Sequence, residues 1–190
     1  MYFIKEQTNQ TLEEKKSKFI AYLTSYDKFD DLMIKLKQEH PKARHFVYAY
    51  RYLNEFDQVV ENCSDDGEPK GTSGKPTLNV LAGNELINSA VIIIRYFGGV
   101  KLGTGGLVRA YSDATNLVIK NSNLIKYEKL DTLILKLDYA ILSKLEYLLD
   151  SLDISIINKE FTESVILKLE LTKEQEENLK LELPRSVEIL

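Results

Sequence analysis

Residues 89–109 read SAVIIIRYFGGVKLGTGGLVR. The run Val91-Ile92-Ile93-Ile94 is typical of a central strand that is covered on both faces. A glycine-rich turn follows directly, and the apolar spacing after it predicts a long helix over residues 105–121. The pattern is therefore a buried strand, a flexible turn and a helix.

The segment before this strand predicts a β-α-β-β opening. Residues 17–24 have the alternation of a strand. A helix follows, which Asp27 or Asp30 can cap and which ends at His40-Pro41, because the residue before proline disfavours helical backbone. The other two strands form a hairpin and cover residues 45–51 and 58–62.

A polar segment, residues 64–76, separates the hairpin from the central strand. No side chain in it is expected to contribute to a core, and loops of this length are usually functional or mobile. Pro76 suits the first position of a short helix that Gly83 would end.

After Asn123 a second pattern of strands and helices begins. It predicts strands at residues 133–137, 154–161, 165–171 and 187–189, with helices at residues 141–152 and 173–183. Thr172 followed by Gln175 has the spacing of a capping box at the start of the second helix. The order β-α-β-β-α-β is that of a ferredoxin-like unit. The fold class is therefore α+β in two domains, residues 1–125 and 126–190.

Composition excludes several classes of protein. With 44% hydrophobic and 28% charged residues among 190, the chain is not disordered as a whole. It has no apolar run of the roughly 20 residues that a membrane helix needs, and no signal peptide, so we expect a cytoplasmic protein without a membrane partner. One Cys and two His cannot make a disulfide, or a closed four-ligand zinc site without carboxylates, so we expect no metal and no cofactor.

The charge is unevenly distributed along the chain. The formal net charge is −4, but residues 1–125 carry 16 basic and 15 acidic residues, against 9 and 14 in residues 126–190. Residues 70–125 hold six basic and only two acidic residues. A local positive potential of this kind can attract a phosphate backbone even in an acidic protein.

Three enzyme motifs that the glycines suggest fail on spacing. A Walker loop would need glycine at Pro69 and Ser or Thr at Pro76. A nucleophile elbow around Ser73 would need glycine at Lys75. The dinucleotide fingerprint starting at Gly103 would need glycine at Val108. We therefore assign no catalytic residue.

The acidic cluster Asp65, Asp66 and Glu68 has two interpretations. It could bind Mg²⁺ or supply a general acid and base. The interpretation that we favour is a turn in which the side chains bond nearby backbone and Gly67 takes a positive φ. His45, at the start of an expected strand, is interpreted as a structural histidine.

The best physical case for a site is the strand, turn and helix quoted first. Free N–H groups at the start of a helix favour an anion, and Lys101, Arg109 and Arg95 could add charge beside them. Tyr96 could add a stacking face. The alternative, that the glycines only permit tight packing, stays open. The candidate anion-binding residues are Lys70, Lys75, Arg95, Tyr96, Lys101, Thr104, Gly105, Gly106 and Arg109.

The same stretches carry a resemblance to a known family. DDGEP at residues 65–69, GTSGKP at 71–76, RYFGGVKLG at 95–103 and GGLVRAY at 105–111 resemble the YigZ/IMPACT family. The resemblance implies a first domain similar to domain IV of elongation factor G, with a ribosomal-protein second-domain-like β-α-β fold, and a ferredoxin-like second domain similar to its domain V. It also implies a role in translation regulation. The motif-loop residues are Asp65, Asp66, Gly67, Glu68, Gly71, Thr72, Ser73 and Gly74.

Two functions are weighed on these grounds. The first is a translation regulator that binds RNA or the ribosome through its glycine-rich, locally basic surface. The alternative is an enzyme that acts on a small phosphorylated or peptidic substrate at the loop from Asp65 to Lys75. We favour the binding protein, because no nucleophile and base stand at a recognisable spacing. The sequence makes no prediction of the oligomeric state.

Overall fold

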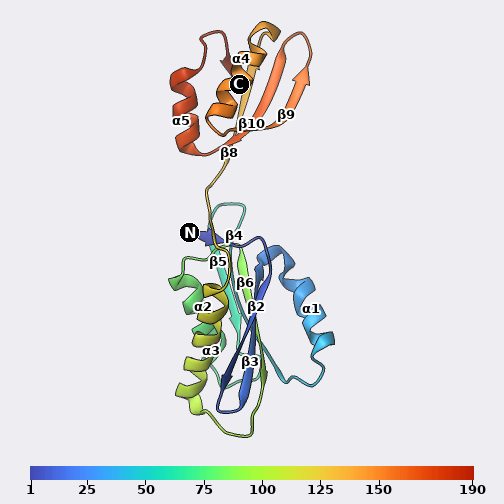
Figure 1. Cartoon of the computed structure of the whole chain (residues 1–190), viewed down its shortest axis with the longest axis vertical. Coiled ribbons are helices and arrows are strands. Elements are labelled where there is room, and N and C mark those ends of the chain that lie inside the picture. The colour runs from blue at the N-terminus through green and yellow to red at the C-terminus, as the bar shows by residue number, and fades with distance from the viewer. The chain divides into compact units, whose positions relative to one another are not determined.

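The computed structural model describes residues 1–190 as two compact units, Met1–Tyr127 and Glu128–Leu190 (Figure 1). We call them unit 1 and unit 2 and describe each by itself. Both are mixed α and β structures, as the sequence predicts. No helix in either unit combines the length and the apolar character that crossing a bilayer would require.

Unit 1 is built on a five-stranded antiparallel sheet with the order β2-β3-β6-β4-β5. Its middle strand, β6, is Ser89–Tyr96, which confirms the prediction of a central strand. The other strands are β2 (Thr8–Glu14), β3 (Ser17–Ser25), β4 (His45–Leu53) and β5 (Val59–Ser64). A short pair, β1 (Tyr2–Phe3) and β7 (Ile125–Lys126), lies outside this sheet.

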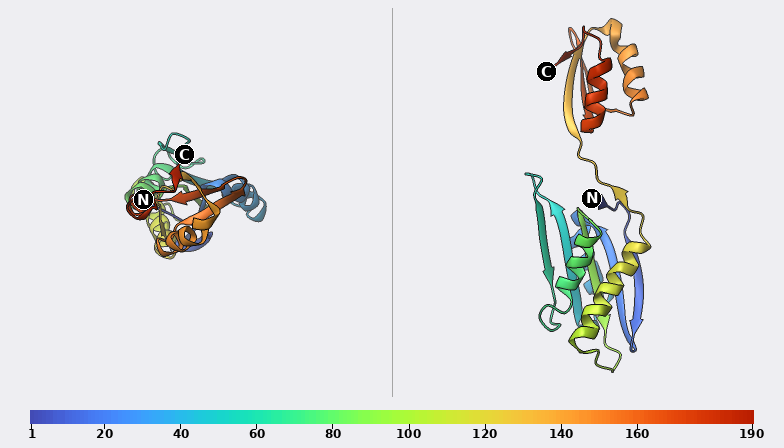
Figure 2. Two further views of the ribbon diagram at one scale, coloured as in Figure 1. Left: turned by 90° about the horizontal axis from the view of Figure 1, so that it is seen from above. Right: turned by 90° about the vertical axis from the view of Figure 1, so that its left-hand side faces the viewer.

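Three helices cover the sheet. Helix α1 (Phe29–Glu39) lies on one face, while α2 (Gly74–Gly83) and α3 (Gly103–Lys120) lie side by side on the other (Figures 1 and 2). Strand alternation sends Val91 and Ile93 toward α2 and α3, and Ile92 and Ile94 toward α1. Since both faces are covered, every side chain from residue 89 to residue 95 is buried.

The sequence does not predict β1 and β2, so the opening of unit 1 is β-β-β-α-β-β. Strand β2 lies at the edge of the sheet, and most of its side chains are polar and exposed, which removes the apolar signal of a strand. The expected cap of α1 is also wrong. A 3-10 turn (Tyr26–Lys28) leads into that helix, and no side chain caps it.

The polar segment at residues 64–76 is more ordered than predicted. Glu68, Thr72 and Ser73 are buried, and α2 begins at Gly74, two residues before Pro76. Gly74 itself fits against the Ser64 backbone, where an added Cβ would come within 2.7 Å of the carbonyl carbon. The segment is therefore a folded part of unit 1.

Unit 2 has the predicted β-α-β-β-α-β order. Its four-stranded antiparallel sheet has the order β11-β8-β10-β9, which is ferredoxin-like. Leucines of β8 and β10 form the core with α4 and α5. The elements are β8 (Asp131–Leu137), a 3-10 turn (Tyr139–Ile141), α4 (Leu142–Ser151), β9 (Ser155–Phe161), β10 (Val165–Leu171), α5 (Lys173–Glu182) and β11 (Glu188–Ile189).

The capping box of α5 is confirmed. Thr172 Oγ1 accepts a hydrogen bond from the Gln175 N–H at 3.2 Å, and Gln175 Oε1 accepts one from the Thr172 N–H at 2.8 Å. The Gln175 side chain also donates to the Asp153 carbonyl, so the cap ties α5 to the end of α4. Helix α5 has few apolar residues and only Leu179 buried, so this cap is expected to matter for its stability.

We therefore expect Thr172→Ala to lower the free energy of unfolding of unit 2 by about 1 kcal/mol, because the helix loses its capping acceptor. Hydrogen exchange measures this in the full chain, with faster exchange in β10 and α5 and no change in β6. Thr172→Ser keeps the acceptor and is the control. Equal exchange in Thr172→Ala and the wild type would show that the cap is not needed.

Candidate functional site at the loop end of unit 1

Four connections meet at one end of unit 1. The register places the β2–β3 turn, the start of β4 and the end of β6 together, since Lys18 pairs with Tyr96 and His45 with Arg95. The β5–α2 loop and the β6–α3 loop leave from this same end. We define the loop end as residues 13–18, 40–44, 65–75 and 97–109.

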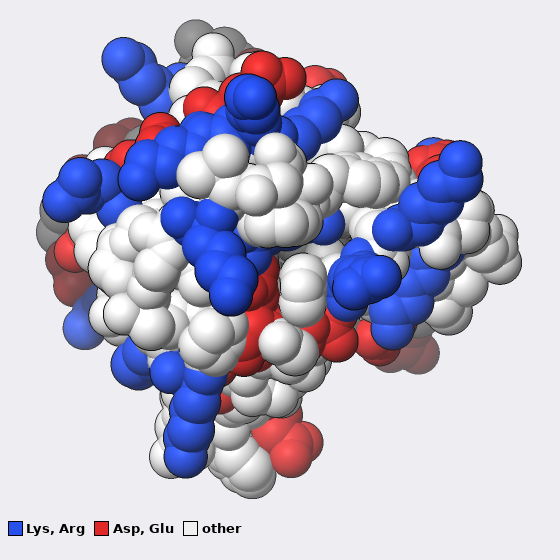
Figure 3. Space-filling view, turned by 90° about the horizontal axis from the view of Figure 1, so that it is seen from below, with Lys and Arg blue, Asp and Glu red and all other residues white.

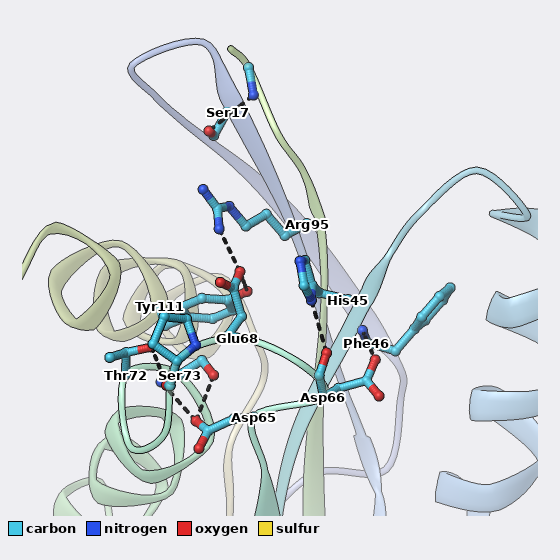
Figure 4. A network of polar contacts seen from close by, with 12 residues as sticks. Ser17, His45, Phe46, Asp65, Asp66, Glu68, Thr72, Ser73, Arg95 and Tyr111 are labelled. Atoms are coloured by element: carbon cyan, nitrogen blue, oxygen red, sulfur yellow. Dashed lines mark hydrogen bonds and ion pairs between the residues drawn. The ribbon is translucent and has the colours of Figure 1, made fainter. Parts of the chain in front are cut away.

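Asp65 organises the β5–α2 loop. Its carboxylate accepts hydrogen bonds from the N–H groups of Gly71 at 2.7 Å, Ser73 at 3.1 Å and Gly74 at 2.8 Å, and from the Ser73 hydroxyl at 2.7 Å (Figure 4). Partial burial alone would raise the pKa of this carboxyl, but these hydrogen bonds outweigh it and lower the pKa below its ordinary value. The start of α2 is thus already occupied by an anion from the protein itself.

Asp66 and Gly67 form the turn that the sequence favours. Asp66 and Gly67 have φ of 41° and 85°, and the Glu68 N–H donates to the Asp65 carbonyl. The Asp66 carboxylate accepts from the Phe46 N–H at 2.6 Å, and its carbonyl accepts from His45 Nδ1 at 2.9 Å. The loop is therefore bonded to the start of β4.

Glu68 forms a buried ion pair with Arg95. Its Oε1 lies 2.6 Å from Arg95 Nη1 and accepts a second hydrogen bond from the Tyr111 hydroxyl at 2.8 Å (Figure 4). Glu68 and Arg95 are only 8% and 7% exposed. Burial, and then the Glu68 charge, raise the pKa of the Tyr111 hydroxyl far above its ordinary value, so Tyr111 stays a donor.

This ion pair corrects the prediction for Arg95 and Tyr96. Arg95 is not a free guanidinium at the surface, because it is buried and paired. Tyr96 cannot act beside it, because neighbouring strand residues point to opposite faces. The Tyr96 hydroxyl lies 2.9 Å from His40 Nδ1, on the α1 face.

Close packing accounts for some glycines of the β6–α3 segment and not for others. A Cβ on Gly98 would come within 1.9 Å of the Lys16 carbonyl carbon, so this glycine permits tight packing against the β2–β3 turn. Gly103 and Gly105 have no atom within 4 Å of an added Cβ. Tight packing therefore explains Gly98, and in part Gly106, where an added Cβ would lie 3.1 Å from Leu102 Cβ, but not Gly103 or Gly105.

The start of α3 is open. The helix begins at Gly103, two residues earlier than predicted, and no side chain caps it. Gly103, Thr104 and Gly105 are exposed, as is Lys101 just before them. Since the first N–H groups of a helix have no partner within it, this end favours an anion.

A pocket of about 420 Å³ lies beside this helix end. One part of its wall is apolar, from Pro69, Phe97, Leu102 and Leu107. The polar part brings together Arg44, His45, Glu68, Arg95, Lys101, Gly103 and Thr104 from three segments. The buried ion pair thus forms part of the wall of the pocket.

The pocket includes only some of the predicted residues. Lys101, Thr104, Arg95 and Glu68 line it, whereas the exposed Lys70, Lys75 and Arg109 do not. Gly105 and Gly106 lie in the first turn of α3 outside the lining. The sequence did not single out Arg44 or Phe97, and it interpreted His45 as structural. The register of β4 against β6 is the signal for Arg44 and His45, and for Phe97 the signal is its place directly after β6, two residues from Arg95.

The loop end is rich in cations. Its four segments hold nine Lys and Arg and five Asp and Glu, and three of those carboxylates, at Asp65, Asp66 and Glu68, accept hydrogen bonds within the protein. Figure 3 looks onto this end and shows Lys and Arg side chains spread around it, with acidic atoms between them. No group of acidic, His and Cys residues is arranged to hold a metal ion.

The fold and these motifs belong to one family. The Impact N-terminal domain matches residues 15–119, and a domain of unknown function, DUF1949, matches residues 135–184. The chain is 38% identical to an IMPACT family member of Haemophilus influenzae, over 85% of this chain and 80% of that protein. It is 36% identical to the IMPACT family member YigZ of Escherichia coli, over 84% and 79%. The chain therefore belongs to the IMPACT family.

A solved structure shares the whole architecture. It is described as that of a hypothetical protein and superposes with a TM-score of 0.67 at 31% identity, covering 100% of this chain and 95% of that one. The resemblance that the motifs suggest is thus confirmed at the level of the family.

We expect Glu68→Gln to lower the free energy of unfolding of unit 1 by about 3 kcal/mol, because it leaves the Arg95 charge buried without a counter-charge. Urea denaturation followed by far-UV circular dichroism measures this. Glu61→Gln, which breaks the more exposed pair with Arg51, is the control and should cost less than about 1 kcal/mol. An equal loss of unfolding free energy in the two variants would contradict the claim that the buried pair stabilises unit 1 more than the exposed pair does.

The lowered pKa of Asp65 predicts a pH dependence. A carboxyl with a depressed folded-state pKa contributes stability above its unfolded pKa of about 3.9 and loses it as pH falls through the folded pKa. The stability difference between wild type and Asp65→Asn should therefore be largest near neutral pH and shrink below about pH 4. Urea denaturation at several pH values tests this. A stability difference that grows on acidification would contradict the lowered pKa of Asp65.

Proposed function

We propose that this IMPACT family member binds RNA, free or within the ribosome, at the loop end of unit 1 and regulates translation through that contact. The observation that carries the proposal is the open start of α3, set among cations from four separate segments. Amide N–H groups, lysines and arginines are the groups that usually contact a phosphate backbone. The family resemblance of the motifs, which implies a role in translation regulation, supports the same function.

The charge distribution favours unit 1 over unit 2 as the RNA-binding part. Residues 126–190 hold 9 basic and 14 acidic residues, and several of the lysines pair with glutamates, such as Lys159 with Glu146. A surface of that sign repels phosphate. The cations of the loop end, by contrast, outnumber its carboxylates, and most of those carboxylates are engaged.

The enzyme alternative has less support. Asp65 is held by four donors, Asp66 by the Phe46 N–H and Glu68 by Arg95 and Tyr111. A general base needs a carboxylate that can reach a substrate proton. These carboxylates are instead used to build the loop that shapes one side of the pocket.

The proposal predicts that Arg44→Glu combined with Lys101→Glu weakens RNA binding at least about tenfold, because two cations become anions at the site. The slope of log affinity against log salt should also fall in magnitude by about 0.7 for each phosphate that the variant no longer neutralises. Fluorescence anisotropy with a single-stranded RNA of about 12 nucleotides measures both.

The control carries the same charge change at the opposite end of unit 1. Lys28 precedes α1 and Lys120 ends α3, whereas the loop end lies at the end of α1 and the start of α3. Lys28→Glu combined with Lys120→Glu should bind RNA nearly as the wild type does. An equal loss of RNA affinity in both double variants would show a non-specific effect of charge and would contradict the proposed site.

A further inference from the structure

The pocket at the loop end has one feature that a phosphate backbone alone does not use, an exposed aromatic ring. Phe97 is 60% exposed and forms part of the apolar wall with Leu102 and Leu107. A flat aromatic face next to a pocket is the surface on which an unstacked base packs. The backbone beside this ring is anchored, since the next residue, Gly98, packs against the Lys16 backbone, and the ring itself has the Arg95 guanidinium carbon 5.8 Å from its centroid.

Another part of the wall suits a phosphate. Lys101, Gly103 and Thr104 line the pocket at the uncapped start of α3, an 18-residue helix. Backbone N–H groups, a hydroxyl and an ammonium group are therefore close together there. The pocket thus has a stacking side and an anion side.

Arg95, which lines the pocket, has N–H donors for which the protein supplies no acceptor. Arg95 is only 7% exposed, and its buried Nε has no hydrogen-bond partner. The structure shows one hydrogen bond from its guanidinium, Nη1 to Glu68, and Figure 4 shows the other terminal nitrogen directed away from Glu68. A guanidinium has several N–H donors and no acceptor, so an oxygen or ring nitrogen of a ligand in the pocket would be a further acceptor for this terminal nitrogen, whereas the buried Nε is out of its reach.

We infer that this pocket holds a single nucleotide of the bound RNA, turned out of its stack, with its base against Phe97 and its phosphate at the first turn of α3. The volume of about 420 Å³ lies within the range of small-ligand pockets, about 300–1,000 Å³. The inference rests on the proposed function, because the cations of the loop end hold the rest of the strand. It goes beyond that function by assigning base recognition to a pocket.

The test uses the full chain, a single-stranded RNA of about 12 nucleotides and the same RNA with abasic residues. Phe97→Ala should weaken binding of the intact RNA about tenfold, since one base can no longer stack, and leave the salt slope unchanged. It should not weaken binding of the abasic RNA. Phe97→Trp keeps a stacking face and should restore the affinity.

Phe56→Ala is the matched control. Phe56 is 71% exposed in the β4–β5 turn, which leaves the sheet at the end opposite the loop end, so this variant should bind both RNAs as the wild type does. Phe97→Ala and the wild type binding the intact RNA equally would overturn the nucleotide pocket and leave the proposed function standing. No binding of either RNA by the wild type would overturn both.

Discussion

The buried ion pair between Glu68 and Arg95 is the contact on which the loop end depends. Arg95 is the last buried residue of the central strand, and Glu68 comes from the β5–α2 loop, whose other side-chain bonds, from Asp65 and Asp66, reach only the loop itself, the start of α2 and the start of β4. Together with the Tyr111 hydroxyl, the pair ties that loop to β6 and to α3 at once. Because two buried charges are tolerated only as partners, the position of the loop is fixed by electrostatics.

The ion pair also bears on the charge that the loop end presents at the surface. With Glu68 held, Asp65 can cap the start of α2 and Asp66 can bond the start of β4. The acidic residues are thus used inside the protein, and the lysines and arginines of the loop end remain to set its potential. An acidic protein thereby presents a locally basic surface, which its net charge of −4 would not suggest.

Much of this fold could be predicted from the sequence. The apolar run of β6, the hairpin of β4 and β5, and β8, α4 and β10 of unit 2 have clear periodicity, and the Thr172 capping box is a local signal for α5. Strand β2 could not be predicted, because it is a polar edge strand whose place is set by pairing with β3. The helix α1 has no side-chain cap to find, although aspartates stand near its start.

The sequence predicts part of the lining of this pocket but not the rest. The glycine-rich turn identified the open helix end and Lys101, whereas Arg44 and His45 reach the pocket only through the register of β4 against β6. Arg95 is expected from the sequence to add its guanidinium to the anion site, and its buried partner, Glu68, lies 27 residues away in the chain, where no local signal reveals it.

Crosslinking bound RNA to the full chain with ultraviolet light, followed by mass spectrometry of the peptides, tests the central claim most directly. The account predicts crosslinks in residues 65–75 and 97–109; crosslinks confined to unit 2 or to the α1 face of unit 1 would contradict it.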